Sequence, residues 1–298
     1  MGQQASQLQL PALSCCTERL DPTKGVSPTS PTVSRNVNAS GTPIPDIAAR
    51  FDAAVRNKDL AELVRLLSSN HKLGSDVVAT QHPWAEQPQT IGALAAVHIA
   101  VLANDPGLRT RLRAAGAIPV LVQFLNASNT SDKVHSAVVA LSFITIENDD
   151  NCQEVYRAGG MPLLVPLISA RPVGLGFASL SVCRNVYCKN RNAREEFSNL
   201  GGIKATVGLL TYNSARASDS AFMDGIFETV SNLSDLVQPD ATTGDSGGRI
   251  GKRAVKEGIV VALTRIHEEC DDEEIKQEAK ELNTKITKFI NSSVAREG

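Results

Sequence analysis

The stretch Ala115-Gly116-Ala117-Ile118-Pro119-Val120-Leu121-Val122-Gln123-Phe124-Leu125 recurs, with changes, three times further along the chain. The later copies occupy 158–168, 200–210 and 257–266, and each has a glycine at its second position before an apolar run. The apolar residues of these runs recur at helical spacing. A helical phrase that returns at a nearly constant interval predicts a solenoid of stacked repeats.

The spacing of the phrase defines the repeats. Its glycines (Gly116, Gly159, Gly201 and Gly258) are 43, 42 and 57 residues apart, and the last interval is longer because a turn-rich insertion occupies 240–248. A second mark keeps the register, since Phe143 and Asn185 each precede the next glycine by sixteen residues. We expect five repeats, at about 46–104, 105–148, 149–190, 191–239 and 249–292.

These phrases resemble the armadillo repeat, with its glycine turn, its Ile-Pro-x-Leu-Val-x-Leu-Leu second helix and its Ala-Leu-x-Asn-Leu third helix. The resemblance covers 46–292 and implies an all-α, right-handed armadillo-repeat superhelix. HEAT repeats, with two helices and a similar period, are the nearest structural alternative. We expect each repeated glycine to permit a tight turn between helices, where a side chain would clash.

Composition excludes several classes of protein. The 30 basic residues nearly balance the 32 acidic ones, so there is no overall basic charge of the kind that binds nucleic acid. Six cysteines in 298 residues do not make a disulfide scaffold, and no apolar run is long enough to span a bilayer. Aromatic residues make up only 4% of the chain, which favours a core of small and aliphatic side chains between stacked helices.

The first 45 residues differ from the rest. They hold six of the fourteen prolines and no aromatic residue, so they cannot bury enough apolar surface to fold, and we expect a disordered tail. The chain opens with Gly2 followed four residues later by Ser6, which fits the N-myristoylation pattern. Cys15 and Cys16 are candidate palmitoylation sites that supply the second anchor which a single myristoyl chain needs. A chance match of both patterns is the alternative.

The concave surface formed by the third helices is the expected binding site. Steps of three or four residues along each third helix predict which side chains line it. They are His135, Val139 and Phe143 in the second repeat, Phe177, Ser181 and Asn185 in the third, Asp224, Glu228, Asn232 and Asp235 in the fourth, and Lys276 and Lys280 in the last. This groove is apolar in the middle, then acidic, then basic, which suits an amphipathic helix or a mixed-charge peptide. Simple solvation of the polar members is the alternative.

Other functions have weak sequence support. Nuclear-import armadillo proteins carry a tryptophan four residues before each groove asparagine, whereas this chain has Val139, Ser181 and Glu228 there. The run 244–248 around Ser246 matches the nucleophile region of trypsin-like proteases, but it lies in a loop of a helical chain without the partner context. No cysteine or histidine has metal-ligand spacing, and no cofactor motif is present. We therefore expect no enzyme, metal, cofactor or small-molecule substrate.

Together these features predict a non-enzymatic scaffold on the cytosolic face of a membrane, which binds a protein or peptide in its groove. The arrangement resembles the armadillo-repeats-only proteins of apicomplexan secretory organelles and the yeast vacuolar membrane armadillo proteins. That resemblance implies an acylated anchor and a role in positioning an organelle or tethering an effector. Ser27 and Ser30, each followed by proline, are candidate sites of regulation. A soluble armadillo adaptor of the ubiquitin pathway or cytoskeleton, without acylation, is the alternative.

Overall fold

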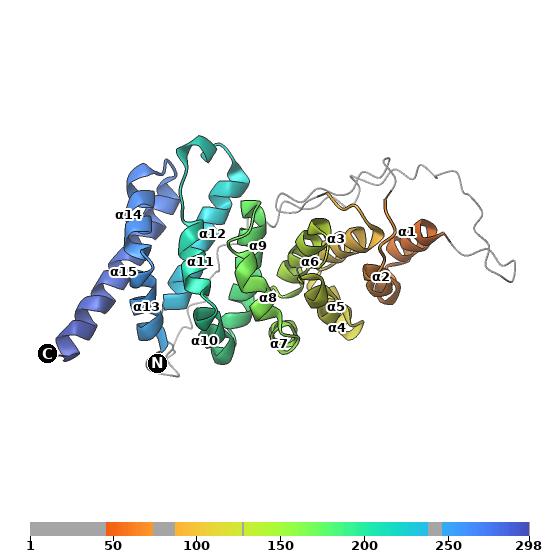
Figure 1. Cartoon of the computed structure of the whole chain (residues 1–298), viewed down its shortest axis with the longest axis horizontal. Helices are drawn as coiled ribbons and strands as arrows, with labels where there is room; N and C mark the ends of the chain where they lie inside the picture. The colour runs from red at the N-terminus through yellow and green to blue at the C-terminus, as the bar shows by residue number, and fades with distance from the viewer. Residues whose placement is uncertain (1–45, 74–86, 127, 238–245, 298) are drawn as a thin grey trace, which may run out of the picture.

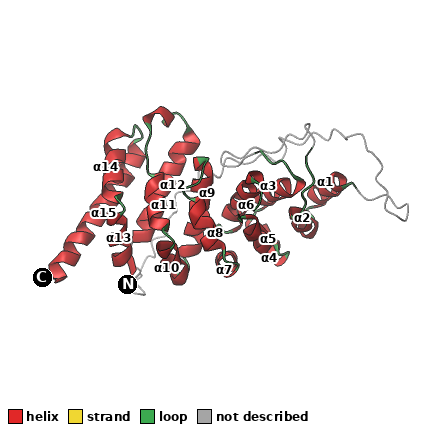
Figure 2. Ribbon diagram, in the orientation of Figure 1, coloured by secondary structure: helices red, strands yellow, loops and turns green. Residues whose placement is uncertain are grey.

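The computed structural model describes residues 46–73, 87–126, 128–237 and 246–297. Within these ranges every extended regular element is helical, and the only strand-like pairing is a single bridge between Lys72 and Thr90 (Figure 2). The predicted all-α fold is confirmed. Among the same residues, no helix combines the length and the apolar composition that crossing a bilayer requires.

The helices fall into five successive groups of three. The first helices are α1 (Ile47–Asn57), α4 (Pro106–Ala114), α7 (Asp149–Arg157), α10 (Arg191–Asn199) and α13 (Ser246–Lys256). The second helices are α2 (Leu60–Leu67), α5 (Ala117–Phe124), α8 (Gly160–Leu167), α11 (Gly202–Leu209) and α14 (Ile259–Glu269). The third helices are α3 (Ile91–Leu102), α6 (Ser131–Ile144), α9 (Val173–Tyr187), α12 (Ser220–Val237) and α15 (Glu273–Glu297). The order of elements thus repeats, as it does in a solenoid.

The third helices form the spine of the solenoid. Each packs against the next, from α3 through α6, α9 and α12 to α15. The first helices α4, α7, α10 and α13 lie along the lower side of the molecule, whereas α1 lies above α2 (Figure 1). The core is continuous through all five groups and is built mainly from leucine, isoleucine, valine and alanine. Such a core explains why so few aromatic residues suffice.

The repeated glycines are required for a reason other than the expected one. Each is the residue before a second helix and has a positive φ, from 75° at Gly159 to 90° at Gly258. A Cβ added at any of the four would meet nothing within 4 Å, so the expected steric clash is wrong. Glycine is needed because a residue with a side chain is strained in the left-handed backbone conformation.

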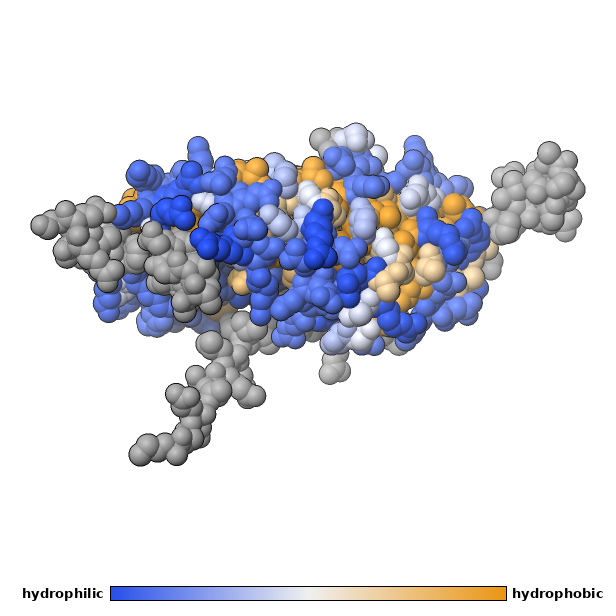
Figure 3. All heavy atoms as spheres, turned by 90° about the horizontal axis from the view of Figure 1, so that it is seen from below, coloured by the Kyte–Doolittle hydropathy of each residue, from blue (hydrophilic) through white to orange (hydrophobic). Residues whose placement is uncertain are grey.

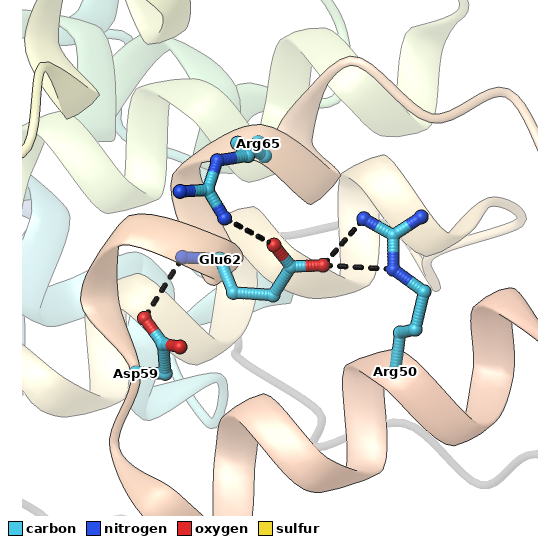
Figure 4. A network of polar contacts seen from close by, with 4 residues as sticks. All are labelled: Arg50, Asp59, Glu62 and Arg65. Atoms are coloured by element: carbon cyan, nitrogen blue, oxygen red, sulfur yellow. Dashed lines mark hydrogen bonds and ion pairs between the residues drawn. The ribbon is translucent and has the colours of Figure 1, made fainter. Parts of the chain in front are cut away.

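Polar side chains cap the first helices in the same repeating way. Asp46, Asp105, Asn148 and Asn190 each precede a first helix and accept a hydrogen bond from a backbone N–H of its first turn. These bonds satisfy donors that a helix N-terminus otherwise leaves without a partner. The turn into α2 is closed likewise by Asp59, beside an ion-pair network in which Glu62 binds both Arg50 and Arg65 (Figure 4).

Side chains of the first helices also tie neighbouring repeats together. The buried Arg109 guanidinium donates to the carbonyl oxygens of Ala103 and Ile146, both at 2.8 Å, at the ends of two third helices. Arg194 of α10 donates in the same way to the carbonyl oxygens of Asp235 and Leu236 at the end of α12. Helix C-termini leave carbonyl groups without partners, so these bonds are a physical reason for a cation at these first-helix positions.

Two boundaries differ from those expected. The predicted insertion 240–248 is partly helical, because α13 already begins at Ser246, while 238–245 lie outside the described residues. The last helix continues past 292 to Glu297.

Seen from below, the surface is mostly hydrophilic over the C-terminal half, and most apolar patches lie over the N-terminal half (Figure 3).

Candidate functional site

Half of the predicted groove residues are buried. His135, Val139, Phe143, Phe177, Ser181 and Asn232 are between 1% and 8% exposed. Their assignment to an accessible contact surface is therefore corrected, although they remain part of the third helices on which the groove is built. The reason is the close approach of these helices, which leaves α6 buried at every position from Asp132 to Ile144.

Phe177 illustrates how a residue on the expected face becomes core. Its ring lies 6.3 Å from the ring of Phe222 on α12, measured between centroids. The opposing position on α12 is Gly225, where an added Cβ would come within 2.2 Å of the Phe177 ring. The absence of a side chain at Gly225 thus lets α9 and α12 approach closely enough to enclose Phe177.

The accessible polar members of the prediction gather on α9 and α12. Asp224, Glu228 and Asp235 are half-buried and recur at helical spacing, so they form one stripe of α12, here called the acidic strip. Asn185 of α9 is half-buried too, and its amide donates to Thr145 Oγ1 of the preceding repeat at 2.9 Å. Four of the twelve predicted residues are therefore half-buried positions of the adjacent helices α9 and α12.

Arg184 also lies in this region, where it binds Asp235. The sequence pattern did not predict it as a site residue. Its Nε and Nη2 atoms donate to Asp235 Oδ2 at 2.9 and 2.6 Å, across 51 residues of chain. Burial lowers the pKa of Arg184, but the hydrogen bond and charge of Asp235 more than offset this, so the pKa is raised. The only available signal was its place directly before Asn185, which does not reveal a partner so distant in sequence.

Lys276 and Lys280 do not join the acidic strip. On the same helix, Lys285 Nζ approaches Ser234 Oγ of α12 at 3.5 Å. Lys276 and Lys280 are rotated from Lys285 by roughly 180° and 140° about the helix axis, so they face away from α12. Lys276 pairs with Glu273 at 2.8 Å, and Lys280 lines a recess of about 330 Å³ between α14 and α15. The predicted basic end of the groove is therefore wrong, because these lysines lie on the terminal face of the solenoid.

The titratable groups that could support other chemistry are buried or dispersed. Burial raises the pKa of the Cys152 thiol to about 12 and also raises that of Cys183, which keeps both thiols protonated. His98 is half-buried with its ring edge-on to Phe51, and burial lowers its pKa. In the part of the chain that the structure describes, no three histidine, cysteine or acidic side chains could hold a metal ion together.

No protein-family model matches the chain, and no curated protein does either. Among solved structures, the armadillo repeats only protein ARO from Plasmodium falciparum superposes with a TM-score of 0.71. The two are 29% identical, over 82% of this chain and 98% of that one. The chain has the armadillo-repeat fold. A designed armadillo repeat protein agrees, with a TM-score of 0.60 and 17% identity over 82% of this chain and 95% of its own.

A further armadillo-repeat structure is a designed protein in complex with the peptide (KR)4, with a TM-score of 0.58 and 18% identity. It matches over 79% of this chain and 84% of its own length. The predicted lipidation sites Gly2, Cys15 and Cys16, and the candidate regulatory sites Ser27 and Ser30, lie outside the described residues.

Proposed function

We propose that the chain is a non-enzymatic scaffold that binds a basic amphipathic helix of a partner protein along α9 and α12. The acidic strip carries this proposal, because it places three carboxylates on one accessible stripe beside an apolar core. One of them, Asp235, pairs with Arg184 at 2.6 Å. Complementary charge favours a cationic partner and raises its association rate.

An apolar contact accompanies the charges. Phe227 and Met223 of α12 are half-buried and pack on the core beside the acidic strip. A helix with apolar residues on one side and basic residues on the other would therefore bury its apolar side against α12. Designed armadillo relatives, one in complex with (KR)4 and another made for modular peptide recognition, support peptide binding as the use of this fold.

The membrane part of the proposal rests on the N-terminal sequence. Acyl groups on Gly2 and on Cys15 and Cys16 would hold the chain at the cytosolic face of a membrane, where it positions an organelle or tethers an effector. Two acyl chains give stable attachment, whereas one gives only marginal binding. The likeness to ARO of Plasmodium falciparum supports the same armadillo scaffold in the two proteins.

The groove is tested with a fluorescent amphipathic Leu–Lys helix and its Leu–Glu counterpart. We expect the basic peptide to bind and the acidic one not to bind. Glu228→Lys should weaken binding about 10-fold, because it replaces an attraction by a repulsion. The lost attraction and the new repulsion together amount to about 1.4 kcal/mol of binding free energy. The matched control is Glu268→Lys, which makes the same charge change at an exposed position of α14. Equal losses in both variants, or binding of the acidic peptide, would contradict the site.

The anchor is tested by metabolic labelling and cell fractionation of the full-length chain. We expect Gly2→Ala to abolish myristate labelling and Cys15→Ser/Cys16→Ser to abolish palmitate labelling, and both to move the protein to the soluble fraction. Ser27→Ala/Ser30→Ala is the control that leaves both labels unchanged. A wild-type chain that carries no lipid and fractionates as soluble would replace this proposal by the soluble adaptor.

A further inference from the structure

A recess lies between α14 and α15, which form the C-terminal end of the solenoid (Figure 1). Its volume is about 330 Å³, which is within the range of small-molecule sites. Two lysines, one histidine, three threonines and one asparagine line it, so the described part of its wall is polar throughout and carries no carboxylate. The same two helices bury Leu263, Ile266, Leu282 and Ile286, each at most 2% exposed, so the recess lies outside the packed core.

Lys280 and Lys288 supply the positive charge of the recess. They are eight residues apart on α15, so their Cα atoms are separated by about 12 Å along the helix axis. Neither takes part in an ion pair with a described residue, whereas Lys276 of the same helix is paired with Glu273 at 2.8 Å. His267 reaches the recess from α14. The recess therefore offers donors spread over a distance that suits a ligand with more than one anionic group.

Hydroxyl oxygens lie between the two lysines along α15. Thr284 Oγ1 donates to the carbonyl oxygen of Lys280 at 2.8 Å, and Thr287 Oγ1 donates to that of Asn283 at 2.9 Å. Because these hydrogens are engaged with the backbone, the two exposed hydroxyl oxygens remain as acceptors. Thr264 Oγ1 accepts from Asn283 Nδ2 at 3.2 Å, which joins the two walls of the recess. A ligand that fits combines anionic groups for the lysines with hydroxyl donors for the threonines.

We infer that this recess binds a phosphorylated polyol, such as an inositol phosphate, either free or as a lipid headgroup. Phosphate oxygens accept charge-assisted hydrogen bonds from lysine ammonium groups, and ring hydroxyls donate to the threonine oxygens. The inference rests on the groups that line the recess rather than on the net charge of the region, because Glu268 and Glu281 lie next to His267 and Lys280 in sequence. It is independent of the acidic strip and of the acyl anchor.

The test is isothermal titration calorimetry of the full-length chain with inositol 1,4,5-trisphosphate, which carries both phosphates and free hydroxyls. We expect binding, and much weaker binding of tripolyphosphate, which has the anionic groups without hydroxyl donors. Lys280→Gln/Lys288→Gln should weaken binding roughly 100-fold, because each lost charge-assisted bond is worth about 10-fold. Glu268→Gln/Glu281→Gln should strengthen binding by about 2-fold to 5-fold, because it removes repulsion beside the recess.

The matched control is Lys72→Gln/Lys204→Gln, which makes the same charge change at exposed positions of the first and fourth repeats and should bind as the wild type does. Equal losses in the two lysine variants would overturn the site, and equal binding of tripolyphosphate would overturn the polyol as its ligand.

The two sources of the ligand are distinguished with the chain made without an acyltransferase and vesicles with and without phosphatidylinositol 4,5-bisphosphate. Co-sedimentation that requires this lipid and both Lys280 and Lys288 supports a lipid headgroup, whereas binding of the free compound alone supports a soluble ligand. Absence of binding in either form would overturn the inference and leave the peptide groove and the acyl anchor untouched.

Discussion

Helices α6 and α12 hold the same place in the second and fourth repeats but present different surfaces. Helix α6 is buried from Asp132 to Ile144, whereas α12 keeps the half-exposed acidic strip along one side. Both helices obey the same repeat pattern and pack on two neighbouring third helices. The difference shows that the repeat determines the shape of the solenoid, while the partner-binding surface depends on which third helices stay accessible.

The same contrast extends to whole halves of the molecule. Most apolar surface patches seen from below lie over the N-terminal half, while the C-terminal half is mostly hydrophilic there (Figure 3). The acidic strip also belongs to the C-terminal half. Substitutions should therefore affect mainly stability in α6 and mainly binding in α12. The following predictions test that division, from the largest expected effect to the smallest.

Removal of a large side chain from α6 should have the greatest effect. Phe143 is 2% exposed, so Phe143→Ala should lower the free energy of unfolding by about 4 kcal/mol through lost burial and a cavity. Phe227→Ala in α12 removes the same atoms at a half-buried site and should cost about half as much. Urea denaturation followed by circular dichroism measures both. Equal costs would mean that the two helices are equally buried in solution.

The packing between α9 and α12 is tested by adding one carbon. Gly225→Ala places a methyl group 2.2 Å from the Phe177 ring and should cost about 2–3 kcal/mol by overpacking. Gly225→Ala combined with Phe177→Leu should recover part of this loss, because the smaller side chain leaves room. Thermal denaturation of the single and double variants provides the comparison, and a double variant less stable than either single one would contradict the contact.

The turn glycines should matter through backbone strain. Gly159→Ala should cost about 1–2 kcal/mol because φ is 75° there, although there is room for the methyl group. Gly208 of α11 also has open space but no positive φ, so Gly208→Ala should be neutral or stabilise by up to about 1 kcal/mol. Chemical denaturation measures the free energy of unfolding of both variants. Similar losses of stability at the two sites would contradict conformational strain as the explanation.

The smallest effect is expected at the N-terminal end. Hydrogen bonds from Arg50 and then Arg65, at 2.9 and 2.6 Å, hold the pKa of Glu62 below its usual 4.5 despite partial burial. Because the pKa is lower in the folded state, the stabilisation is complete above pH 4.5 and is lost as pH falls through the lowered pKa. Both arginines are exposed, so Glu62→Gln should cost only about 0.5 kcal/mol at pH 7 and less than that at pH 3. Denaturation at the two pH values measures this, and an equal cost at both would refute the ion-pair explanation.

Sequence periodicity was sufficient for the fold. The repeated glycines and the helical spacing of apolar residues identified the helices, and Asn185, Asp224, Glu228 and Asp235, predicted to line the groove, are half-buried positions of α9 and α12. These patterns could not show that Phe177 is enclosed, because that depends on how closely α9 and α12 approach at Gly225. Nor could they reveal the Arg184–Asp235 pair, whose partners lie 51 residues apart.

By itself the sequence determined that the chain is a stack of three-helix repeats, because hydrophobic spacing and turn glycines act within a few residues of one another. It also specified the composition of the tail that carries Gly2, Cys15 and Cys16. Only the tertiary structure decided which third helices are buried and which lysines face the end of the solenoid rather than the groove. The physical reason is that accessibility depends on the distance and rotation between helices from different repeats, which a pattern along one helix does not contain.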